Sequence, residues 1–210
     1  FSFHPVKMIT TGEGGMATTN SDSLHEKMVL LRSHGVTRDS ALMDEKSHGP
    51  WFYQQLILGF NYRMTDIQAA LGINQMSRLG EFIERRREIA TVYNNAFQEL
   101  PVITPWQHAD NCSPFHLYVI RLELDKITKT HRQVFDDLRK AEINVNLHYI
   151  PVHTHPFYRK LGFNYGDFPE AESYYREAIS LPIFYGLNEV EQKYIINVLK
   201  SSLFNESDVS

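Results

Sequence analysis

Apolar residues that recur every three to four positions predict helices, and apolar residues that alternate with polar ones predict strands. The helical pattern covers residues 24–33, 65–100, 131–141, 171–180 and 188–203. Strand patterns, rich in β-branched or aromatic residues, cover residues 16–19, 115–124 and 143–149. From residue 101 onward the expected helices and strands mix without repeated β-α-β units, which favours an α+β domain.

The longest helical stretch, residues 65–100, begins after Thr65, a good N-cap residue. Gly80 is expected to divide it into two helices. The run Arg85-Arg86-Arg87 has two interpretations: a patch that binds phosphate or nucleic acid, or a solvated helix face with local ion pairs. The glutamates on both sides of the run favour the solvated face.

The composition narrows the class of protein. A formal net charge of -4 gives no reason to expect nucleic-acid binding. The single cysteine, Cys112, excludes an intramolecular disulfide framework and fits a reducing, cytoplasmic location. No apolar run approaches the ~20 residues that a membrane helix needs, so no membrane insertion is expected.

The first fifteen residues place one lysine between an aromatic, proline-containing run and a glycine-rich turn: Phe1-Ser2-Phe3-His4-Pro5-Val6-Lys7-Met8-Ile9-Thr10-Thr11-Gly12-Glu13-Gly14-Gly15. A lysine that forms an imine must be held on a constrained loop and partly desolvated, so that some of its amine is neutral. A lone lysine is more often a solvated surface charge, and composition alone favours that role for Lys7.

Three blocks together resemble the DegT/DnrJ family of nucleotide-sugar aminotransferases, which use pyridoxal phosphate. The first block is the lysine segment, and the second spans residues 59–72, Gly-Phe-Asn-Tyr-Arg-Met-Thr-Asp-Ile-Gln-Ala-Ala-Leu-Gly. The third spans residues 148–153, His-Tyr-Ile-Pro-Val-His. The blocks follow the family's order and cover nearly the whole chain, but only the second half of a family member.

The resemblance implies an α/β fold joined to an α+β domain: the C-terminal part of a fold-type I transferase dependent on pyridoxal phosphate. Residues 1–64 would end the large cofactor-binding domain, and residues 65–100 would form connecting long helices. Residues 101–204 would form the small C-terminal domain, and residues 205–210 a frayed tail. Family members carry a large segment before this lysine, so a fragment is expected.

The activity implied is transfer of an amino group from an amino acid, with L-glutamate the expected donor, to the 4-keto carbon of a UDP-linked 4-keto-6-deoxy sugar. The product would feed cell-surface glycan synthesis, and the likeness is strongest to members on the route to pseudaminic acid. A sugar dehydratase on this scaffold would carry histidine in place of Lys7. A non-catalytic dimerisation or binding module remains the alternative, and this chain alone is expected to be inactive.

The resemblance also assigns site residues. Lys7 would bond covalently to pyridoxal phosphate and carry protons. Ser2 would donate to the cofactor phosphate, with a turn or cap serine as the alternative. Asn61 would reach the phosphate held by the neighbouring subunit, which makes a homodimer with shared active sites; helix capping is its alternative. Arg63 would meet a negative substrate group or brace the dimer, or form a surface ion pair.

The third block is expected to face the sugar nucleotide, with Tyr149 and His153 as contacts. Pro151 restricts the backbone and so fixes the directions of its neighbours. The closeness of His148, His153 and His155 in the sequence raises zinc as an alternative. No thiolate or acidic partner accompanies them, so no metal site is expected.

Overall fold

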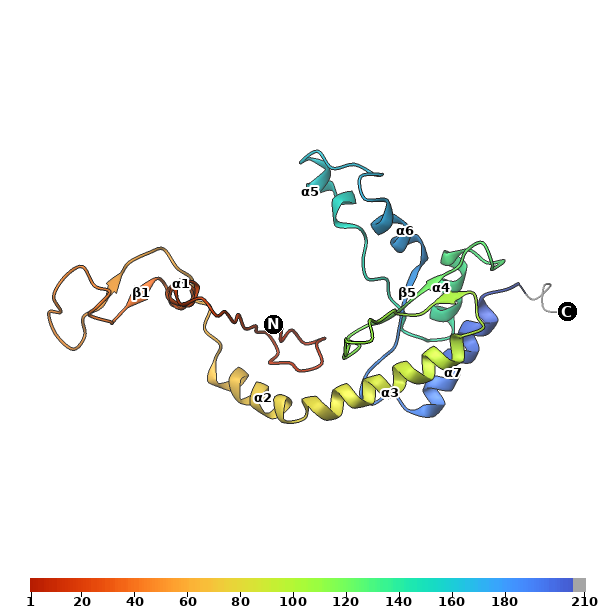
Figure 1. Ribbon diagram of the computed structural model, residues 1–210, viewed down its shortest axis with the longest axis horizontal. Helices are drawn as coiled ribbons and strands as arrows, with labels where there is room; N and C mark the ends of the chain where they lie inside the picture. The colour runs from red at the N-terminus through yellow and green to blue at the C-terminus, as the bar shows by residue number, and fades with distance from the viewer. Residues whose placement is uncertain (206–210) are drawn as a thin grey trace. The chain divides into compact units, whose positions relative to one another are not determined.

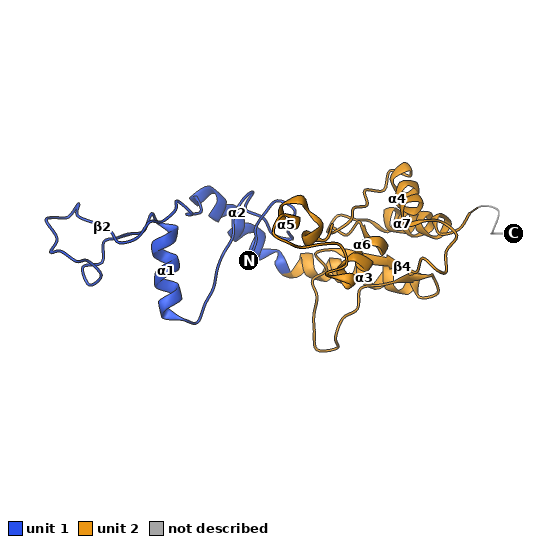
Figure 2. Cartoon of the chain, turned by 90° about the horizontal axis from the view of Figure 1, so that it is seen from above, with its two compact units in different colours: residues 1–79 blue, residues 80–210 orange. Residues whose placement is uncertain are grey.

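The computed structural model describes residues 1–205 of the chain (Figure 1). The chain divides into two units, residues 1–79 and the residues from Gly80 onward (Figure 2). The finer division expected from the sequence, into segments 1–64, 65–100 and 101–204, stays a prediction. The expected tail at 205–210 lies outside the described residues except for Asn205, whose backbone N–H donates to the Thr128 hydroxyl.

The first unit contains two helices and one short antiparallel strand pair. Its elements are α1 (Asp22–Arg32), β1 (Val36–Thr37), β2 (Gln54–Gln55) and α2 (Asp66–Ser77). The hydroxyl of Ser21 caps α1 by accepting from the backbone of the first turn. At α2, the side chains of Thr65 and Gln68 each accept from the other's backbone N–H, which forms a capping box.

The first unit has no apolar core of its own. No residue of α1 is buried, and three of its apolar side chains, Leu24, Val29 and Leu31, are exposed. The predicted strand at 16–19 is absent; the neighbouring Gly15 only forms an isolated bridge with Ser2. Among the described residues, every buried apolar core residue belongs to the second unit.

The second unit packs helices on a three-stranded antiparallel sheet with the order β3-β4-β5. Its elements are α3 (Leu79–Phe97), β3 (Val102–Ile103), β4 (Tyr118–Leu122), α4 (His131–Lys140), the 3₁₀ turn η1 (Val152–Thr154), α5 (Pro156–Arg159), α6 (Pro169–Glu177), β5 (Ala178–Leu181) and α7 (Glu189–Ser202). In the register of the central strand, Val102 pairs with Leu122, and Tyr118 pairs with Leu181.

Two buried tyrosines join α3 to the central strand β4. The rings of Tyr93 and Tyr118 lie 4.9 Å apart between centroids, and both side chains are fully buried. Each hydroxyl has a partner: Tyr93 donates to the carbonyl of Pro182 at 3.0 Å, and Tyr118 donates to Asn94 Oδ1 at 2.6 Å. The tyrosines therefore fill the core without leaving a buried hydroxyl unpaired.

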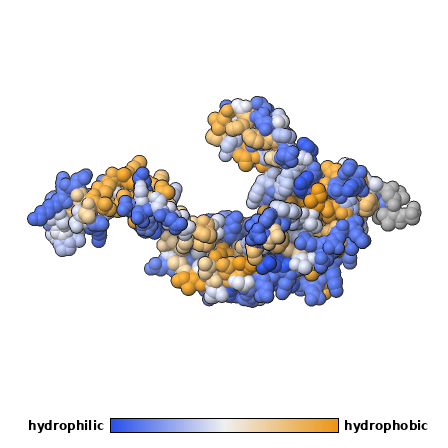
Figure 3. All heavy atoms as spheres, in the orientation of Figure 1, coloured by the Kyte–Doolittle hydropathy of each residue, from blue (hydrophilic) through white to orange (hydrophobic). Residues whose placement is uncertain are grey.

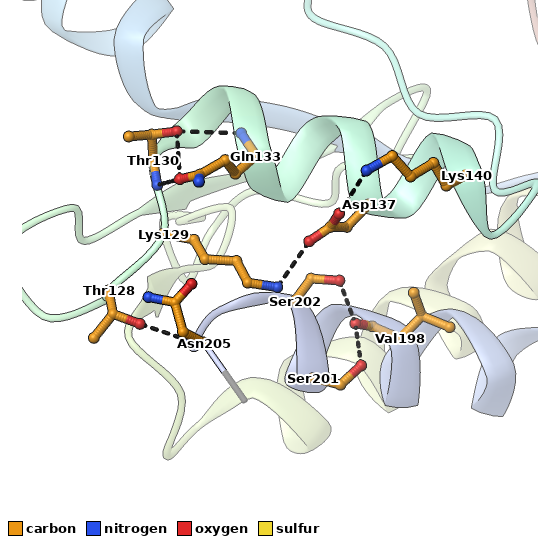
Figure 4. Close-up of polar contacts among 10 residues, drawn as sticks. All are labelled: Thr128, Lys129, Thr130, Gln133, Asp137, Lys140, Val198, Ser201, Ser202 and Asn205. Atoms are coloured by element: carbon orange, nitrogen blue, oxygen red, sulfur yellow. Dashed lines mark hydrogen bonds and ion pairs between the residues drawn. The ribbon is translucent and has the colours of Figure 1, made fainter. Parts of the chain in front are cut away.

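Helix α4 is fixed at its start and on the side that faces α7 (Figure 4). Thr130 and Gln133 form its capping box. The ammonium of Lys129 donates to Asp137 Oδ2 at 2.8 Å, and this bond lowers the pKa of the Asp137 carboxyl. These contacts explain why the predicted helix at 131–141 forms almost in full.

The arginine run on α3 corrects one prediction. Arg85 pairs with Glu88 at 2.9 Å, as a solvated helix face requires. Arg86 is buried instead, and its Nη1 donates to the carbonyls of Phe115 and Ile183 at 3.0 and 2.9 Å. The solvated-face interpretation is therefore wrong for Arg86. The carbonyls that accept its hydrogen bonds lie in distant parts of the chain, so the local sequence does not indicate them.

Four further features of the secondary structure differ from the prediction. The long helical stretch breaks at Arg78, the C-cap of α2, so that Gly80 lies inside α3. The predicted helix at 171–180 ends at Glu177, because the next four residues pair with β4 as β5. Residues 143–149 form no regular strand; only Asn146 makes an isolated bridge, to Ser180. The short strand β3 lies at residues 102–103, where the sequence predicted no strand.

An arm formed by η1, α5 and α6 leads away from the sheet and returns to it at β5 (Figure 1). Apolar side chains gather on its outer part (Figure 3). The more exposed of them are Val152, Phe157, Leu161, Phe163 and Phe168. No helix among residues 1–205 is long and apolar enough to cross a membrane.

Candidate functional site

The segment that carries Lys7 is closed into a loop by backbone contacts between its ends. The N–H of Phe3 donates to the carbonyl of Gly14 at 2.9 Å, and Ser2 bridges to Gly15 in antiparallel fashion. A Cβ at Gly14 would overlap the side chain of Thr11, so the glycine-rich turn depends on the absence of a side chain there.

Inside the loop, Lys7 sits on a short turn. Its backbone N–H donates to the carbonyl of His4 at 2.9 Å. The carbonyl of Phe3 accepts from both the Thr11 N–H and the Thr10 hydroxyl, each at 3.0 Å. The Lys7 side chain is half-buried, and within the described chain its ammonium makes no hydrogen bond or ion pair. The backbone is therefore constrained while the amine stays available.

Helix α2 supports this loop. Gln68 Nε2 donates to the carbonyl of Glu13 at 3.0 Å, in addition to its part in the capping box. The buried Thr11 hydroxyl donates to the same carbonyl at 2.7 Å. A Cβ at Gly72 would lie 2.8 Å from Thr11 Cγ2, so the glycine on α2 allows the loop to pack closely against the helix.

Asn61 lies on an extended segment beside the end of α1, where it forms an isolated bridge with Ser33. Its side chain is exposed, and the capping of α2 belongs to Thr65, so the structure does not use Asn61 as a cap. No hydrogen bond between described residues joins Asn61 to Ser2 or Lys7. Its amide is therefore free to serve a ligand or another subunit.

Arg63 lines an open groove of about 900 Å³ in the first unit. The rings of Phe60 and Tyr62 stack beside it with their centroids 4.8 Å apart. Other lining side chains lie on α1, on or just before α2, or next to the glycine-rich turn: Met16, His25, Met28, Val29, Leu31, Arg32, Met64 and Gln68. Arg63 forms no ion pair with another described residue, so its surface-pair alternative is not realised.

Tyr149 and His153 belong to the second unit, and their environments differ. Tyr149 is 70% exposed. His153 is buried, and its Nε2–H donates to Glu172 Oε1 at 2.8 Å. Gly166 N–H donates to the same oxygen at 2.6 Å. The hydrogen bond from His153 lowers the pKa of the Glu172 carboxyl, followed by that from Gly166.

His148, the residue before Tyr149, also has a protein partner. Its Nδ1 lies 2.7 Å from the hydroxyl of Ser180 on β5, and burial lowers the pKa of its imidazole. His155 is exposed. Among residues 1–205, no three histidine, cysteine or acidic side chains are grouped closely enough to hold a metal ion.

The structure thus brings Ser2 and Lys7 onto one loop and places Asn61 and Arg63 on one segment. Sequence reasoning missed three supporting residues: Gln68, Glu172 and Ser180. A local signal existed for Gln68, since a threonine followed three residues later by glutamine is typical of a capping box. No local signal pointed to the other two, because their histidine partners lie 19 and 32 residues earlier in the chain.

The donor chemistry fits pyridoxal phosphate. A lysine amine can bond to an aldehyde, and a serine hydroxyl and an asparagine amide can both donate to phosphate oxygens. The Ser2 side chain is exposed at the mouth of the loop that carries Lys7.

Comparison with known proteins agrees with this chemistry. The DegT/DnrJ/EryC1/StrS aminotransferase family matches residues 1–200. The chain is 41% identical over 202 residues to protein MJ1066 of Methanocaldococcus jannaschii, across 95% of this chain and 52% of that protein. It is 35% identical over 204 residues to the UDP-4-amino-4,6-dideoxy-N-acetyl-beta-L-altrosamine transaminase of Campylobacter jejuni. This match covers 97% of this chain and 51% of that transaminase. The chain spans about half the length of the curated relatives it matches.

Solved structures agree. Helicobacter pylori PseC, an aminotransferase involved in the biosynthesis of pseudoaminic acid, aligns with a TM-score of 0.85 and 32% identity, over 97% of this chain and 52% of PseC. The putative sugar aminotransferase Spr1654 of Streptococcus pneumoniae, in its PMP-form, aligns with a TM-score of 0.84 and 30% identity. This alignment covers 96% of this chain and 52% of Spr1654. The predicted fold class, part of an aminotransferase with mixed helices and sheet, is confirmed.

Proposed function

The chain belongs to the DegT/DnrJ/EryC1/StrS aminotransferase family, and we propose that it supplies the lysine-bearing part of a nucleotide-sugar aminotransferase dependent on pyridoxal phosphate. The whole protein would move an amino group from an amino acid, with L-glutamate the expected donor, to the 4-keto carbon of a UDP-linked 4-keto-6-deoxy sugar. The Campylobacter transaminase and PseC support this substrate class and a role in cell-surface glycan synthesis of the pseudaminic acid type. A cytoplasmic location is part of the proposal.

The observation that carries the proposal is the setting of Lys7. Its loop is closed at both ends and rests on α2, so the amine is held by a constrained backbone. Half-burial keeps part of the side chain from water, and no carboxylate among the described residues pairs with the ammonium. A lysine that must alternate between a covalent bond and a free amine needs these features.

Pyridoxal phosphate, when bound, supplies an aldehyde for the lysine and a ring that accepts an electron pair during transfer. Lys7 would hold the cofactor covalently at Nζ, then carry a proton as a free amine during the transfer. The Ser2 hydroxyl would donate to the phosphate from the same loop. The Asn61 amide would donate to the phosphate of a second subunit, so we propose a homodimer with shared sites.

The substrate side of the proposal rests on Arg63 and Tyr149. Arg63 is an unpaired cation beside two stacked aromatic rings, which suits a negatively charged group. Tyr149 offers an exposed ring and hydroxyl. His153 was also expected to contact substrate, but its burial and its bond to Glu172 favour a supporting role.

The rival function is a non-catalytic dimerisation or binding module. It is favoured by one observation: the chain spans about half the length of its relatives. No acidic residue is identified in the described part as the partner of the pyridine nitrogen of the cofactor. Without an acid at that nitrogen the ring is a poorer electron acceptor, so we propose that this chain alone does not turn over substrate.

Visible absorption with added pyridoxal phosphate separates the two functions. The wild-type chain and Lys7→Ala are compared, both alone and within a protein of full family length that contains this chain. A borohydride-sensitive band of bound cofactor in the full-length wild type, absent from Lys7→Ala, supports the aminotransferase. Free-cofactor absorption in both full-length proteins supports the module. Steady turnover of a keto-sugar by the 210-residue chain alone would contradict the expected inactivity.

A further inference from the structure

Residues 148–153 form a short segment that a histidine holds at each end. His148 Nδ1 lies 2.7 Å from Ser180 Oγ on β5, and His153 Nε2 lies 2.8 Å from Glu172 Oε1 on α6. We propose that His148 and His153 are positioning residues, which hold the segment so that the exposed Tyr149 meets the sugar nucleotide in one orientation. The identity of the ligand rests on the proposed function. The two histidine contacts, called the anchors below, rest on the geometry alone.

The first anchor fixes His148 to the sheet. Ser180 is buried, and its backbone N–H donates to the carbonyl of Asn146 at 2.8 Å while its strand pairs with β4. The ring of Tyr149 meets the His148 ring edge-on, with centroids 4.6 Å apart and planes at 83°. The orientation of the tyrosine thus depends on a histidine whose own ring is tied to the core.

The second anchor fixes His153 to the arm. The imidazole is 7% exposed and lies against the ring of Phe168, with centroids 4.8 Å apart. Glu172 Oε1 accepts from both His153 and the backbone of Gly166, so one carboxylate oxygen joins η1, the loop before α6, and α6 itself. Arg176 favours the charged form of this carboxylate from one turn further along α6.

Little freedom is left between the anchors. Pro151 has a φ of -57°, and its carbonyl accepts from the buried Thr154 hydroxyl at 2.7 Å. A side chain on a segment that is already ordered binds its ligand without the entropic cost of ordering the backbone. Tyr149 is exposed, whereas His148 before it and Pro151 two residues after it are held. This is the arrangement expected of a preorganised contact.

The anchors are tested first on the chain itself, by amide hydrogen exchange across residues 147–154. His153→Phe keeps a ring against Phe168 but removes the donor, and His153→Gln keeps a donor near the Nε2 position. His155→Phe is the matched control, since this histidine is exposed two residues away. Loss of a hydrogen bond to a charged group should raise exchange about tenfold to a hundredfold in His153→Phe. His153→Gln and the control should stay near wild type.

His148→Phe removes the other anchor and should raise exchange in the same segment, although less, because its partner is neutral. Glu172→Met removes the acceptor while nearly keeping the size of the side chain, and it replaces His153→Phe if that variant does not fold. The proposal would be overturned if exchange stayed unchanged in His148→Phe and also in His153→Phe or its replacement Glu172→Met.

The link to substrate is tested in a protein of full family length that contains this chain. Both anchor variants should raise KM for the sugar nucleotide while kcat and the bound-cofactor absorption stay near wild type, and His153→Gln should restore KM. Raised exchange with an unchanged KM would overturn the positioning role. Failure of the wild type to transaminate would instead refute the proposed function. The exchange result would still show whether the two histidines hold the segment.

Discussion

Arg86 Nη1 donates a 2.9 Å hydrogen bond to the carbonyl of Ile183, a residue 97 positions further along the chain. The same nitrogen donates to the carbonyl of Phe115 at 3.0 Å. Burial lowers the pKa of this guanidinium, because desolvation disfavours the charged form. Arg86 thus joins α3, the approach to β4 and the segment after β5 through backbone carbonyls.

Arg86→Met should lower the free energy of unfolding by about 1–3 kcal/mol, because methionine fills space but leaves buried carbonyls without a donor. The matched control is Arg87→Met, since Arg87 is exposed on the same helix and a surface change is worth about 0.5 kcal/mol or less. Urea unfolding of the chain measures both. Equal stability of the two variants would show that the Arg86 contacts contribute nothing.

Asp137 gives the fold a pH dependence. Its bond from Lys129 lowers the pKa of the carboxyl below the ordinary 3.8, so this pair stabilises the fold fully above that value. The contribution is lost as the pH falls through the lowered pKa. Asp137→Asn should therefore cost about 0.2–1 kcal/mol near neutral pH and progressively less below 3.8. Thermal unfolding across this pH range checks it; a difference that grows on acidification would contradict the sign.

Local signals explain what the sequence could predict. Thr65, Thr130 and Asn188 each begin a helix with a capping box, and the polar partner three residues later is visible in the sequence. The starts of α2, α4 and α7 were therefore predicted correctly. The lysine loop could also be recognised in the sequence, because its motif and its glycine-rich turn are contiguous.

Distant partners explain what the sequence could not predict. Residues 178–180 fit a helical pattern, but their pairing with β4 makes them a strand. Arg86 has the local sequence of a surface charge. Its burial could not be predicted, because the carbonyls that accept its hydrogen bonds lie 29 and 97 residues away. The bond between His153 and Glu172 could not be predicted for the same reason, since Glu172 lies on another element.

Gly72→Ala should disturb the lysine loop. The added Cβ would lie 2.8 Å from Thr11 Cγ2, and Thr11 is buried with its hydroxyl already committed to Glu13. Gly80→Ala is the matched control: its Cβ meets nothing within 4 Å, and alanine should stabilise α3 by up to about 1 kcal/mol. Limited proteolysis and hydrogen exchange of residues 1–15 report the disturbance. Adding Thr11→Ser, which removes the methyl group, should relieve it; no relief would place the cause elsewhere.

Lys7→Ala should abolish transamination in a full-length protein that contains this chain, while the unfolding temperature changes little. The Lys7 side chain is half-buried and makes no hydrogen bond to a described residue, so its loss removes chemistry rather than packing. Lys27→Ala on α1 is the control, because Lys27 is exposed. Borohydride reduction followed by peptide mapping should place the pyridoxyl group on Lys7, and a label on another lysine contradicts the assignment.

Asn61→Ala should weaken cofactor binding in the full-length protein without removing the covalent lysine. A hydrogen bond to phosphate has a charged acceptor, so its loss should cost roughly 1.5–3 kcal/mol, or about tenfold to a hundredfold in cofactor affinity. Titration with pyridoxal phosphate measures the change. An unaltered affinity would mean that the amide does not contact the phosphate in either subunit.

Mixed dimers decide which subunit receives the Asn61 amide. One subunit carries Lys7→Ala and the other carries Asn61→Ala. If Asn61 acts across the interface, the site with an intact Lys7 receives an intact Asn61 from its partner, and one site in each mixed dimer recovers. If Asn61 acts within its own subunit, every site has one defect and activity stays low. The shared-site proposal predicts the first outcome; within the chain, Asn61 is exposed and bridges to Ser33. Absence of recovery, with mixed dimers shown to form by mass, would rule out the shared site.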